Sequence, residues 1–142
     1  MEKDFHHLNN YINKLNLSCD VFIEPGRYLV AESGILASKV TQIHKKDDTT
    51  FIGLSTGMNS LIRPTLYNSY HEIDNISNTE NDKHMYTIVG PICESGDVFG
   101  EKRILNKVKV DNVIVIKTCG AYGYTMSSNY NMRKPAKELI IV

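Results

Sequence analysis

The pattern of hydrophobic and polar residues changes at about residue 38 of this 142-residue chain. Before that point, the spacing of apolar positions in residues 2–16 predicts an amphipathic helix whose apolar stripe packs on a neighbour. The stripe consists of Phe5, Leu8, Ile12 and Leu15. The apolar run 21–23 predicts a short strand, and residues 28–37 are rich in helix formers and predict a second helix. The front of the chain therefore predicts one βα unit.

From residue 38 onward, short apolar runs recur at close intervals, separated by Gly, Pro, Asn and Asp. Such a succession is typical of a β-sandwich or a Greek-key barrel. The predicted strands are 39–44, 50–55, 70–76, 85–89, 112–117 and 137–142. We therefore expect a mainly β protein with some α-helix, in which residues 38–142 form the β-domain.

The predicted front unit cannot bury its own surfaces, because a parallel strand needs neighbouring strands and covering helices on both faces. Residues 1–37 then either lie over the β-domain or form the last βα pieces of a TIM-like (β/α)8 barrel. In the second arrangement most of that barrel lies outside this sequence. The pattern alone leaves both arrangements open.

Composition and charge exclude several classes of function. Basic and acidic residues both number 16, so the chain lacks the positive excess that nucleic acid or a polybasic membrane surface requires. No apolar run approaches the roughly 20 residues that span a bilayer, and the polar start shows no secretory signal. The cysteines Cys19, Cys93 and Cys119 form no C-x-x-C pair, which argues against a disulfide framework or a metal site. A reducing, cytoplasmic location is expected.

Arginine stands at only four positions, so each is a candidate for planar recognition of a carboxylate or phosphate. The first candidate segment, 24–27, is Glu-Pro-Gly-Arg at the end of the first predicted strand. Gly26 lets a ligand approach the backbone, the helix start that follows offers amide groups to an anion, and Arg27 supplies a guanidinium fork. A plain turn with a surface arginine explains the same residues equally well.

A second segment places Arg63 and Tyr67 four residues apart, which puts them on one face of a helical turn. A guanidinium and a phenol together form a good receptor for a carboxylate. The alternative interpretation is a half-buried Tyr67 that belongs to the core and an Arg63 that is solvated.

A third segment places Cys93 and Glu94 side by side in a loop bounded by Pro91 and Gly96. A thiol with a pKa of about 8.5 keeps its proton at neutral pH and can act as a general acid. Glu94 can bind a substrate ammonium group. A lone cysteine is, however, more commonly a small buried hydrophobic residue.

The fourth segment, 119–131, combines small residues with several tyrosines. A small-residue turn that presents Tyr122 and Tyr124 suits stacking on a bound ligand or a hydrogen bond to it. Aromatic packing at the edge of a sheet is the alternative explanation.

Taken in order, these segments resemble diaminopimelate decarboxylase, a pyridoxal-phosphate enzyme of the alanine-racemase-like fold group. The residues that carry the resemblance are Glu24-Pro-Gly-Arg27, Gly57-Met-Asn, Arg63-Pro, Leu66-Tyr67, Gly90-Pro-Ile-Cys93-Glu94-Ser-Gly-Asp97, Gly120-Ala-Tyr122-Gly and Met126-Ser-Ser-Asn-Tyr-Asn. The resemblance spans residues 20–142 and corresponds to the carboxy-terminal third of the family's enzyme.

The resemblance implies an amino-terminal (β/α)8 barrel that holds pyridoxal 5'-phosphate, followed by a β-domain. Residues 1–37 then correspond to the end of the barrel and residues 38–142 to the β-domain. It further implies a homodimer in which the Cys–Glu loop of one subunit completes the active site of the other. The Schiff-base lysine belongs to the missing amino-terminal barrel, so the chain alone is expected to be inactive.

The resemblance also assigns a role to each matching residue. The implied cofactor-binding residues are Glu24, Pro25, Gly26, Arg27 and Tyr122. The implied substrate-binding residues are Arg27, Arg63, Tyr67, Glu94 and Tyr122. Among them, Arg63 and Tyr67 hold the distal carboxylate of the substrate and Glu94 its distal ammonium. Cys93 is the implied catalytic proton donor, Asp97 is mainly structural, and no residue binds a metal.

Three positions depart from the family's pattern. Ser55 stands where an aspartate is usual, and Thr118 and Cys119 replace an Asp-Ala pair. No residue expected to touch a ligand is lost, so the departures concern local hydrogen bonds.

The implied function is decarboxylation of meso-2,6-diaminopimelate to L-lysine and CO2, a step of lysine biosynthesis, in a complete enzyme that contains this chain. Two alternatives remain: a decarboxylase of another basic amino acid or a carboxy-polyamine, and a non-catalytic β-domain that binds a full-length homologue. Glu94 beside Cys93, together with a receptor for a second carboxylate at Arg63 and Tyr67, favours diaminopimelate.

Overall fold

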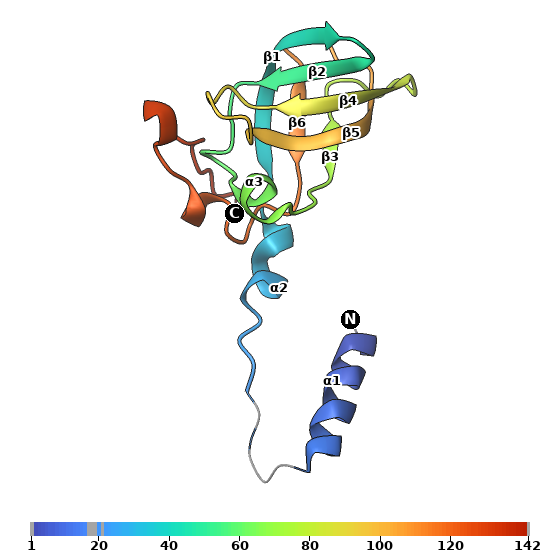
Figure 1. Ribbon diagram of the computed structural model, residues 1–142, viewed down its shortest axis with the longest axis vertical. Coiled ribbons are helices and arrows are strands. Elements are labelled where there is room, and N and C mark those ends of the chain that lie inside the picture. The colour runs from blue at the N-terminus through green and yellow to red at the C-terminus, as the bar shows by residue number, and fades with distance from the viewer. Residues whose placement is uncertain (1, 17–19, 21, 142) are drawn as a thin grey trace.

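The computed structural model describes residues 2–16, 20 and 22–141. In that part of the chain, three α-helices and six strands form a mainly β structure (Figure 1). The helices are α1 (Glu2–Leu15), α2 (Gly26–Val30) and α3 (Arg63–Tyr67). The strands are β1 (Leu36–Lys46), β2 (Thr49–Leu54), β3 (Ile73–Asn75), β4 (Lys83–Val89), β5 (Val98–Asn106) and β6 (Val113–Ile116). Short 3-10 turns occupy Ala31–Ser33, Tyr124–Met126 and Tyr130–Met132.

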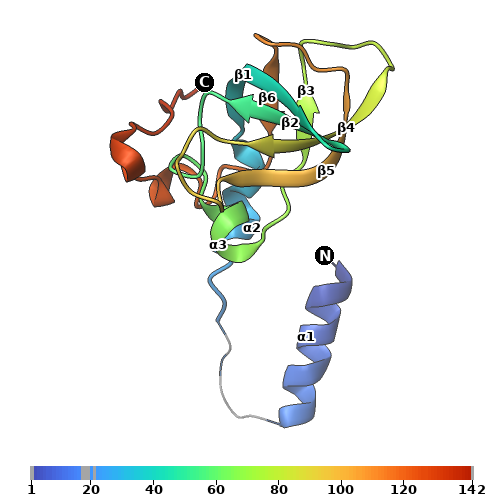
Figure 2. The ribbon, with the colours of Figure 1, turned by 45° about the horizontal axis from the view of Figure 1, so that its top comes forward.

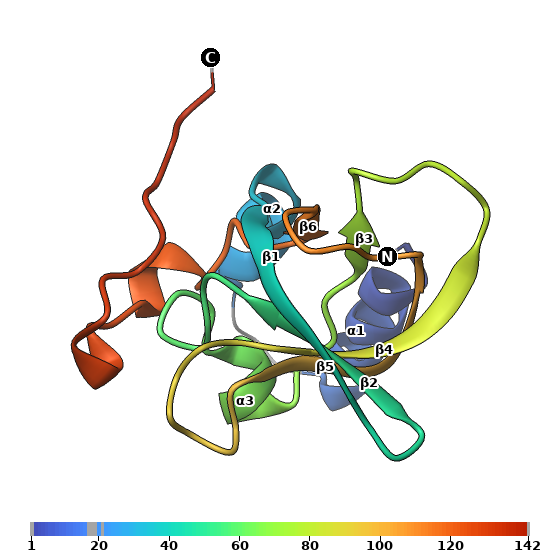
Figure 3. The same ribbon diagram turned by 90° about the horizontal axis from the view of Figure 1, so that it is seen from above.

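The strands form one strongly curved sheet in the order β3-β6-β1-β2-β4-β5. β2 and β4 run parallel, and the other neighbouring pairs are antiparallel. The two edge strands approach each other, because the Asn75 side-chain amide at the end of β3 donates to the Lys107 carbonyl just after β5, at 3.0 Å. The sheet is therefore a nearly closed barrel, as Figure 3 shows from above. The prediction of a mainly β domain with a barrel-like sheet is confirmed.

The interior of the barrel is filled by aliphatic and aromatic side chains from every part of the sheet. Its fully buried members are Val40, Ile52, Leu54, Leu61, Ile88, Phe99, Ile114 and Ile116. Each such side chain contributes about 1.5–3 kcal/mol relative to an exposed position. This packing fixes the register of the strands, because a shift by one residue would turn the apolar set outward.

We expect Ile114→Ala to lower the free energy of unfolding by about 2–5 kcal/mol, because it leaves a cavity in the core of the barrel. Urea denaturation measures the change. The matched control is Ile104→Ala on β5, where the side chain is 68% exposed, and its effect should stay within about 0.5 kcal/mol. Equal losses for the two variants would contradict the placement of the core.

Five of the six strands predicted in the β-domain are found, as β1, β2, β3, β4 and β6, although β3 is shorter than predicted. The prediction of a strand over 137–142 is wrong: Lys137–Ile141 form no strand, and Val142 lies outside the described residues. The segment before it is instead held on the loop after β2, where the Ala136 amide donates to the Ser60 hydroxyl at 2.9 Å, and it pairs with neither edge strand of the sheet. β5 was missed because polar residues interrupt it and because Lys102 has a left-handed φ of 51°.

The described part of residues 1–37 differs more from its predicted structure than the strands of the β-domain do. The helix predicted over 2–16 is α1. The expected packing of its stripe is not found at Leu8 and Leu15, which are exposed, and α1 stands apart from the β-domain in Figures 1 and 2. The strand predicted over 21–23 is wrong at Phe22 and Ile23, which are irregular, while Val21 lies outside the described residues. None of the described helices is long and apolar enough to cross a membrane.

The second predicted helix, 28–37, is also much shorter in the structure. Helix α2 ends at Val30, a 3-10 turn follows, and Leu36 already belongs to β1. The physical reason is a close backbone approach: the Cys119 amide donates to the Gly34 carbonyl at 2.8 Å, and a Cβ on Gly34 would meet the Gly120 backbone. Gly34 is extended for this contact and ends the helical turns.

Candidate functional site

Arg63 begins α3 and is the central cation of the candidate site. The residue is only 8% exposed, which is unusual for an arginine. Its Cζ lies 5.6 Å from the ring centroid of Tyr67 and 5.8 Å from that of Tyr122. Its Nη2 donates to the Ser69 hydroxyl at 3.2 Å. Two aromatic faces and one hydroxyl thus hold the guanidinium, which orients its fork.

Tyr122 lies in a strained turn that brings it to the start of α2. Its φ is 59°, a left-handed value that is unusual for an aromatic residue and that marks many binding sites. The turn is anchored by the Gly120 amide, which donates to the Ala31 carbonyl at 2.9 Å. A Cβ at position 26 would lie 2.8 Å from the Tyr122 hydroxyl oxygen. A side chain at position 26 would therefore displace this hydroxyl, and Gly26 leaves room for its close approach.

These contacts bring together three of the four segments that the sequence singles out. Arg63 and Tyr67 come from α3, Tyr122 from the turn after β6, and Gly26 from the start of α2, where Arg27 follows it. Glu24 belongs to the same turn, because its carbonyl accepts a hydrogen bond from the Gly26 amide at 2.8 Å. Pro25 lies between them and is half-buried, while Glu24 and Arg27 are exposed. The cluster is an assembly of cation, phenol and backbone groups suited to anionic ligands.

The third segment is not part of this cluster. Cys93 and Glu94 are exposed, and no hydrogen bond or stacking contact given for the described residues joins them to Arg63 or Tyr122. Their loop is tied to α3, since the Thr65 hydroxyl donates to the Gly96 carbonyl at 2.6 Å. The thiol and the carboxylate themselves are exposed to solvent and are not engaged with the arginine receptor within one chain.

Asp97 holds this loop in place. Its buried carboxylate accepts hydrogen bonds from the Met58 amide at 2.6 Å and the Ile92 amide at 2.7 Å. Burial raises the pKa of Asp97, and the two backbone hydrogen bonds oppose that shift. The structural role expected for Asp97 is confirmed, because the carboxylate joins the loop after β2 to the Cys–Glu loop.

A buried histidine beneath the cluster was missed by the sequence analysis. His71 is 3% exposed, and its Nδ1 lies 2.9 Å from the Lys117 carbonyl. A carbonyl only accepts, so Nδ1 carries the proton and Nε2, which is buried without a partner, does not. Burial lowers the pKa of His71, and the charges of Arg63, Arg103 and Arg27 lower it further. In the sequence it is simply a histidine that follows Tyr70, and nothing in that pattern distinguishes it from a histidine on the surface.

The thiol of Cys119, one of the departures from the family's pattern, lies beside this histidine. Its Sγ is 4.0 Å from His71 Nδ1 and donates to the Ile116 carbonyl at 3.3 Å. Burial raises the pKa of Cys119 to about 11. The imidazole nitrogen that faces the sulfur already donates its proton to a carbonyl, so it cannot serve as a base. Cys119 is therefore a packed thiol and not an activated nucleophile.

The other departures make local contacts. The Ser55 hydroxyl lies 3.0 Å from the Ser38 hydroxyl and accepts from the Lys39 amide at 3.3 Å, which joins the end of β2 to β1. Thr118 has a left-handed φ of 61° in the turn that leads to Tyr122. Among the described residues, no group of three or more His, Cys, Asp or Glu side chains is placed to hold a metal ion.

The lowered pKa of His71 predicts a pH dependence of stability. Below its usual value of 6.5, the unfolded chain binds a proton that the folded chain does not, so the free energy of unfolding should fall as the pH drops below 6.5. Above 6.5 this contribution is constant. We expect His71→Gln to flatten the decline, because an amide can donate to the same carbonyl without titrating. Urea denaturation between pH 7.5 and pH 5 measures the free energy of unfolding of both chains as a function of pH.

The matched control for this prediction is His44→Gln, because His44 is exposed on β1. In that variant the free energy of unfolding should fall below pH 6.5 as steeply as it does in the unmodified chain. A decline of the same steepness in His71→Gln would show that other groups cause the pH dependence.

Comparison with known proteins identifies the domain. Residues 27–120 match the family described as pyridoxal-dependent decarboxylase, C-terminal sheet domain. The chain belongs to this family. The match covers α2 from its second residue onward, α3, all six strands and the turn that precedes Tyr122.

Curated relatives and solved structures show which members of this family the chain is similar to. Diaminopimelate decarboxylase of Zymomonas mobilis is 42% identical over 124 residues, which cover 87% of this chain and 29% of that protein. The crystal structure of diaminopimelate decarboxylase from M. jannaschii with L-lysine is 40% identical, with a TM-score of 0.78 over 92% of this chain and 30% of that one. Lysine/ornithine decarboxylase from Vibrio vulnificus shares the fold at 21% identity and a TM-score of 0.71. The chain thus spans about three-tenths of the relatives it matches.

Proposed function

We propose that this chain is the carboxy-terminal β-domain of a diaminopimelate decarboxylase. The complete enzyme would remove CO2 from meso-2,6-diaminopimelate and release L-lysine. The observation that carries this proposal is the buried Arg63 guanidinium between Tyr67 and Tyr122, next to Gly26 and Arg27. The substrate has a second carboxylate that lysine and ornithine lack, and this fork is suited to bind it.

The residues around Gly26 fit pyridoxal 5'-phosphate. The absent Cβ of Gly26 leaves room for the Tyr122 hydroxyl, and the Arg27 guanidinium follows in the chain, so a phenol and a cation lie at one turn. Such donors suit a phosphate group. We therefore assign Glu24, Pro25, Gly26, Arg27 and Tyr122 to cofactor binding. When bound, the cofactor would take up the electron pair that departing CO2 leaves on the substrate.

The side chains of this domain would bind the substrate at both of its ends and supply one proton. Arg63 and Tyr67 hold the distal carboxylate, and Arg27 and Tyr122 lie at the junction between cofactor and substrate. Glu94 binds the distal ammonium. The Cys93 thiol donates its proton to the carbon from which CO2 has left, and it regains a proton from solvent.

The exposed positions of Cys93 and Glu94 support a shared active site. Because Cys93 and Glu94 are exposed and make no described contact with Arg63 within one chain, we propose that their loop enters the site of a second subunit in a homodimer. Each site would then combine the arginine receptor of one subunit with the Cys–Glu loop of the other. The lysine that binds the cofactor covalently would come from the amino-terminal barrel.

The apolar front of the chain supports a contact with that barrel. Phe22 is 87% exposed and Leu29 69% exposed, and both lie in the segment that leads into the receptor cluster. We propose that residues 1–37 form the end of the cofactor-binding barrel and that residues 38–142 form the β-domain. A cytoplasmic location fits such an amino-acid biosynthetic enzyme.

The test is a chimera that joins this chain to the barrel of the M. jannaschii relative, loaded with pyridoxal phosphate. We expect CO2 release from meso-diaminopimelate and none from L-lysine or L-ornithine. Turnover of either of those amino acids instead would favour another decarboxylase. Cofactor binding without turnover of any substrate, together with co-purification of the chain with a full-length homologue, would favour a non-catalytic binding domain.

A further inference from the structure

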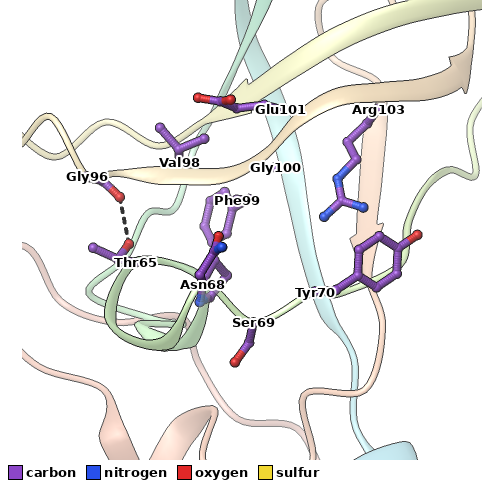
Figure 4. Close-up of a pocket in the computed structure, with 11 residues that line it drawn as sticks. Thr65, Asn68, Ser69, Tyr70, Gly96, Val98, Phe99, Gly100, Glu101 and Arg103 are labelled. Atoms are coloured by element: carbon purple, nitrogen blue, oxygen red, sulfur yellow. Dashed lines mark hydrogen bonds between the residues drawn. The ribbon is translucent and has the colours of Figure 1, made fainter.

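A groove with a volume of about 490 Å³ lies between α3 and β5, beside the cluster described above (Figure 4). Thr65, Asn68 and Ser69 line it from α3 and the residues that follow, and Gly100 and Arg103 line it from β5. Its volume lies in the range of pockets that bind small molecules. The residues proposed for cofactor and substrate binding do not line it.

Arg103 is fixed in this groove by three features. Its Cζ lies 4.1 Å from the centroid of the Tyr70 ring, a stacked contact. On the other side the guanidinium lies against Gly100, where a Cβ would collide with its Nε. Between the two residues Lys102 has a left-handed φ, and the pairing of β5 with β4 shifts its register there. This bulge aims the arginine back across the glycine, as bulges near binding sites commonly do.

The charge of Arg103 has no counter-ion in the described part of the chain. Among the described residues Arg103 forms no ion pair, and its Nε is buried without a hydrogen-bond partner. Figure 4 shows Glu101 pointing away from the guanidinium, which instead points toward Tyr70 and Ser69. A positioned but unneutralised guanidinium beside hydroxyl and amide groups is typical of a site for an anion.

We propose that this groove binds a small carboxylate compound and that Arg103 is its receptor. The planar fork matches the two oxygens of a carboxylate. The Ser69 hydroxyl, which points away from Arg103 in Figure 4, accepts from Arg63 Nη2 and so ties the lining of the groove to the neighbouring receptor.

The test uses the 142-residue chain without cofactor or barrel, so its outcome does not depend on decarboxylase activity. Glutarate is titrated against the 15N-labelled chain at low salt, and the amide resonances of Ser69 and Tyr70 are followed. We expect saturable shifts with glutarate and none with 1,5-diaminopentane, which has the same length but no carboxylate. Arg103→Met should weaken glutarate binding about tenfold or more, equivalent to about 1.4 kcal/mol.

Gly100→Ala is the decisive companion variant, because it displaces the guanidinium without changing the charge of the chain. It should weaken binding to a similar extent, whereas Arg133→Met, which removes an exposed arginine elsewhere, should not. The amide spectra of all variants show whether the fold is kept.

Several outcomes would overturn the proposal. They are the absence of a saturable shift with glutarate, tighter binding of inorganic phosphate than of glutarate, and unchanged binding in Arg103→Met and Gly100→Ala. Loss of binding in Arg63→Met but not in Arg103→Met would place the carboxylate in the neighbouring cluster and would also overturn it.

Discussion

Replacing Cys93 by alanine in a complete enzyme that contains this domain should lower kcat by about 10²–10⁴-fold, the usual contribution of one acid–base group. The thiol is exposed on its loop, as the proposed proton donor to a shared active site has to be. Because the change removes a proton donor and not a binding group, KM for diaminopimelate should change much less than kcat. Steady-state kinetics of CO2 release measures both constants.

The control for Cys93 comes from the same loop. Ser95→Ala removes an exposed hydroxyl two residues away and should leave kcat within about twofold, since surface changes of this kind are nearly neutral. A rate for Cys93→Ala close to that of the unmodified enzyme would remove the thiol from the mechanism.

Arg63→Lys should lower kcat/KM for diaminopimelate by about 10–100-fold, although it preserves the charge. An ammonium cannot reproduce the planar fork or its position between the rings of Tyr67 and Tyr122. The loss corresponds to one hydrogen bond to a charged group, about 1.5–3 kcal/mol. Most of it should appear in KM, because the distal carboxylate remains unchanged during the reaction.

The matched control for Arg63 is Arg133→Lys, which makes the same chemical change at an exposed arginine. Its kinetic constants should equal those of the unmodified enzyme. An unchanged KM in Arg63→Lys would contradict the receptor assignment. Tyr122→Phe then separates the hydroxyl from the ring, because it keeps the aromatic face toward the guanidinium and removes the group that approaches Gly26.

The β-domain could be predicted because its strands are short apolar runs between turn residues, a pattern with a direct physical cause. β5 escaped this reasoning because Glu101, Lys102 and Arg103 occupy its centre, where a bulge turns the strand. The front could not be predicted from its own residues. The end of its second helix is determined by the Gly34–Gly120 contact, which joins positions far apart in the chain.

The candidate site was predictable as a set of residues but not as a geometry. Spacing indicated that Arg63 and Tyr67 share a face, and the structure places both rings around the guanidinium as described. No sequence pattern indicated His71 or Ser69, because their contacts with the site arise only from the residues that the fold places beside them.

The contact between Asn75 and Lys107 has a consequence for how this domain associates with other proteins. A sheet with an open edge can recruit a foreign strand, and that route leads to fibrils as readily as to specific complexes. Here a side-chain contact bridges the two margins of the sheet, although β3 and β5 are not paired with each other. Removing the Asn75 amide should therefore free these margins for strand addition, and fibril formation by Asn75→Ala, compared with the unmodified chain, would measure this effect.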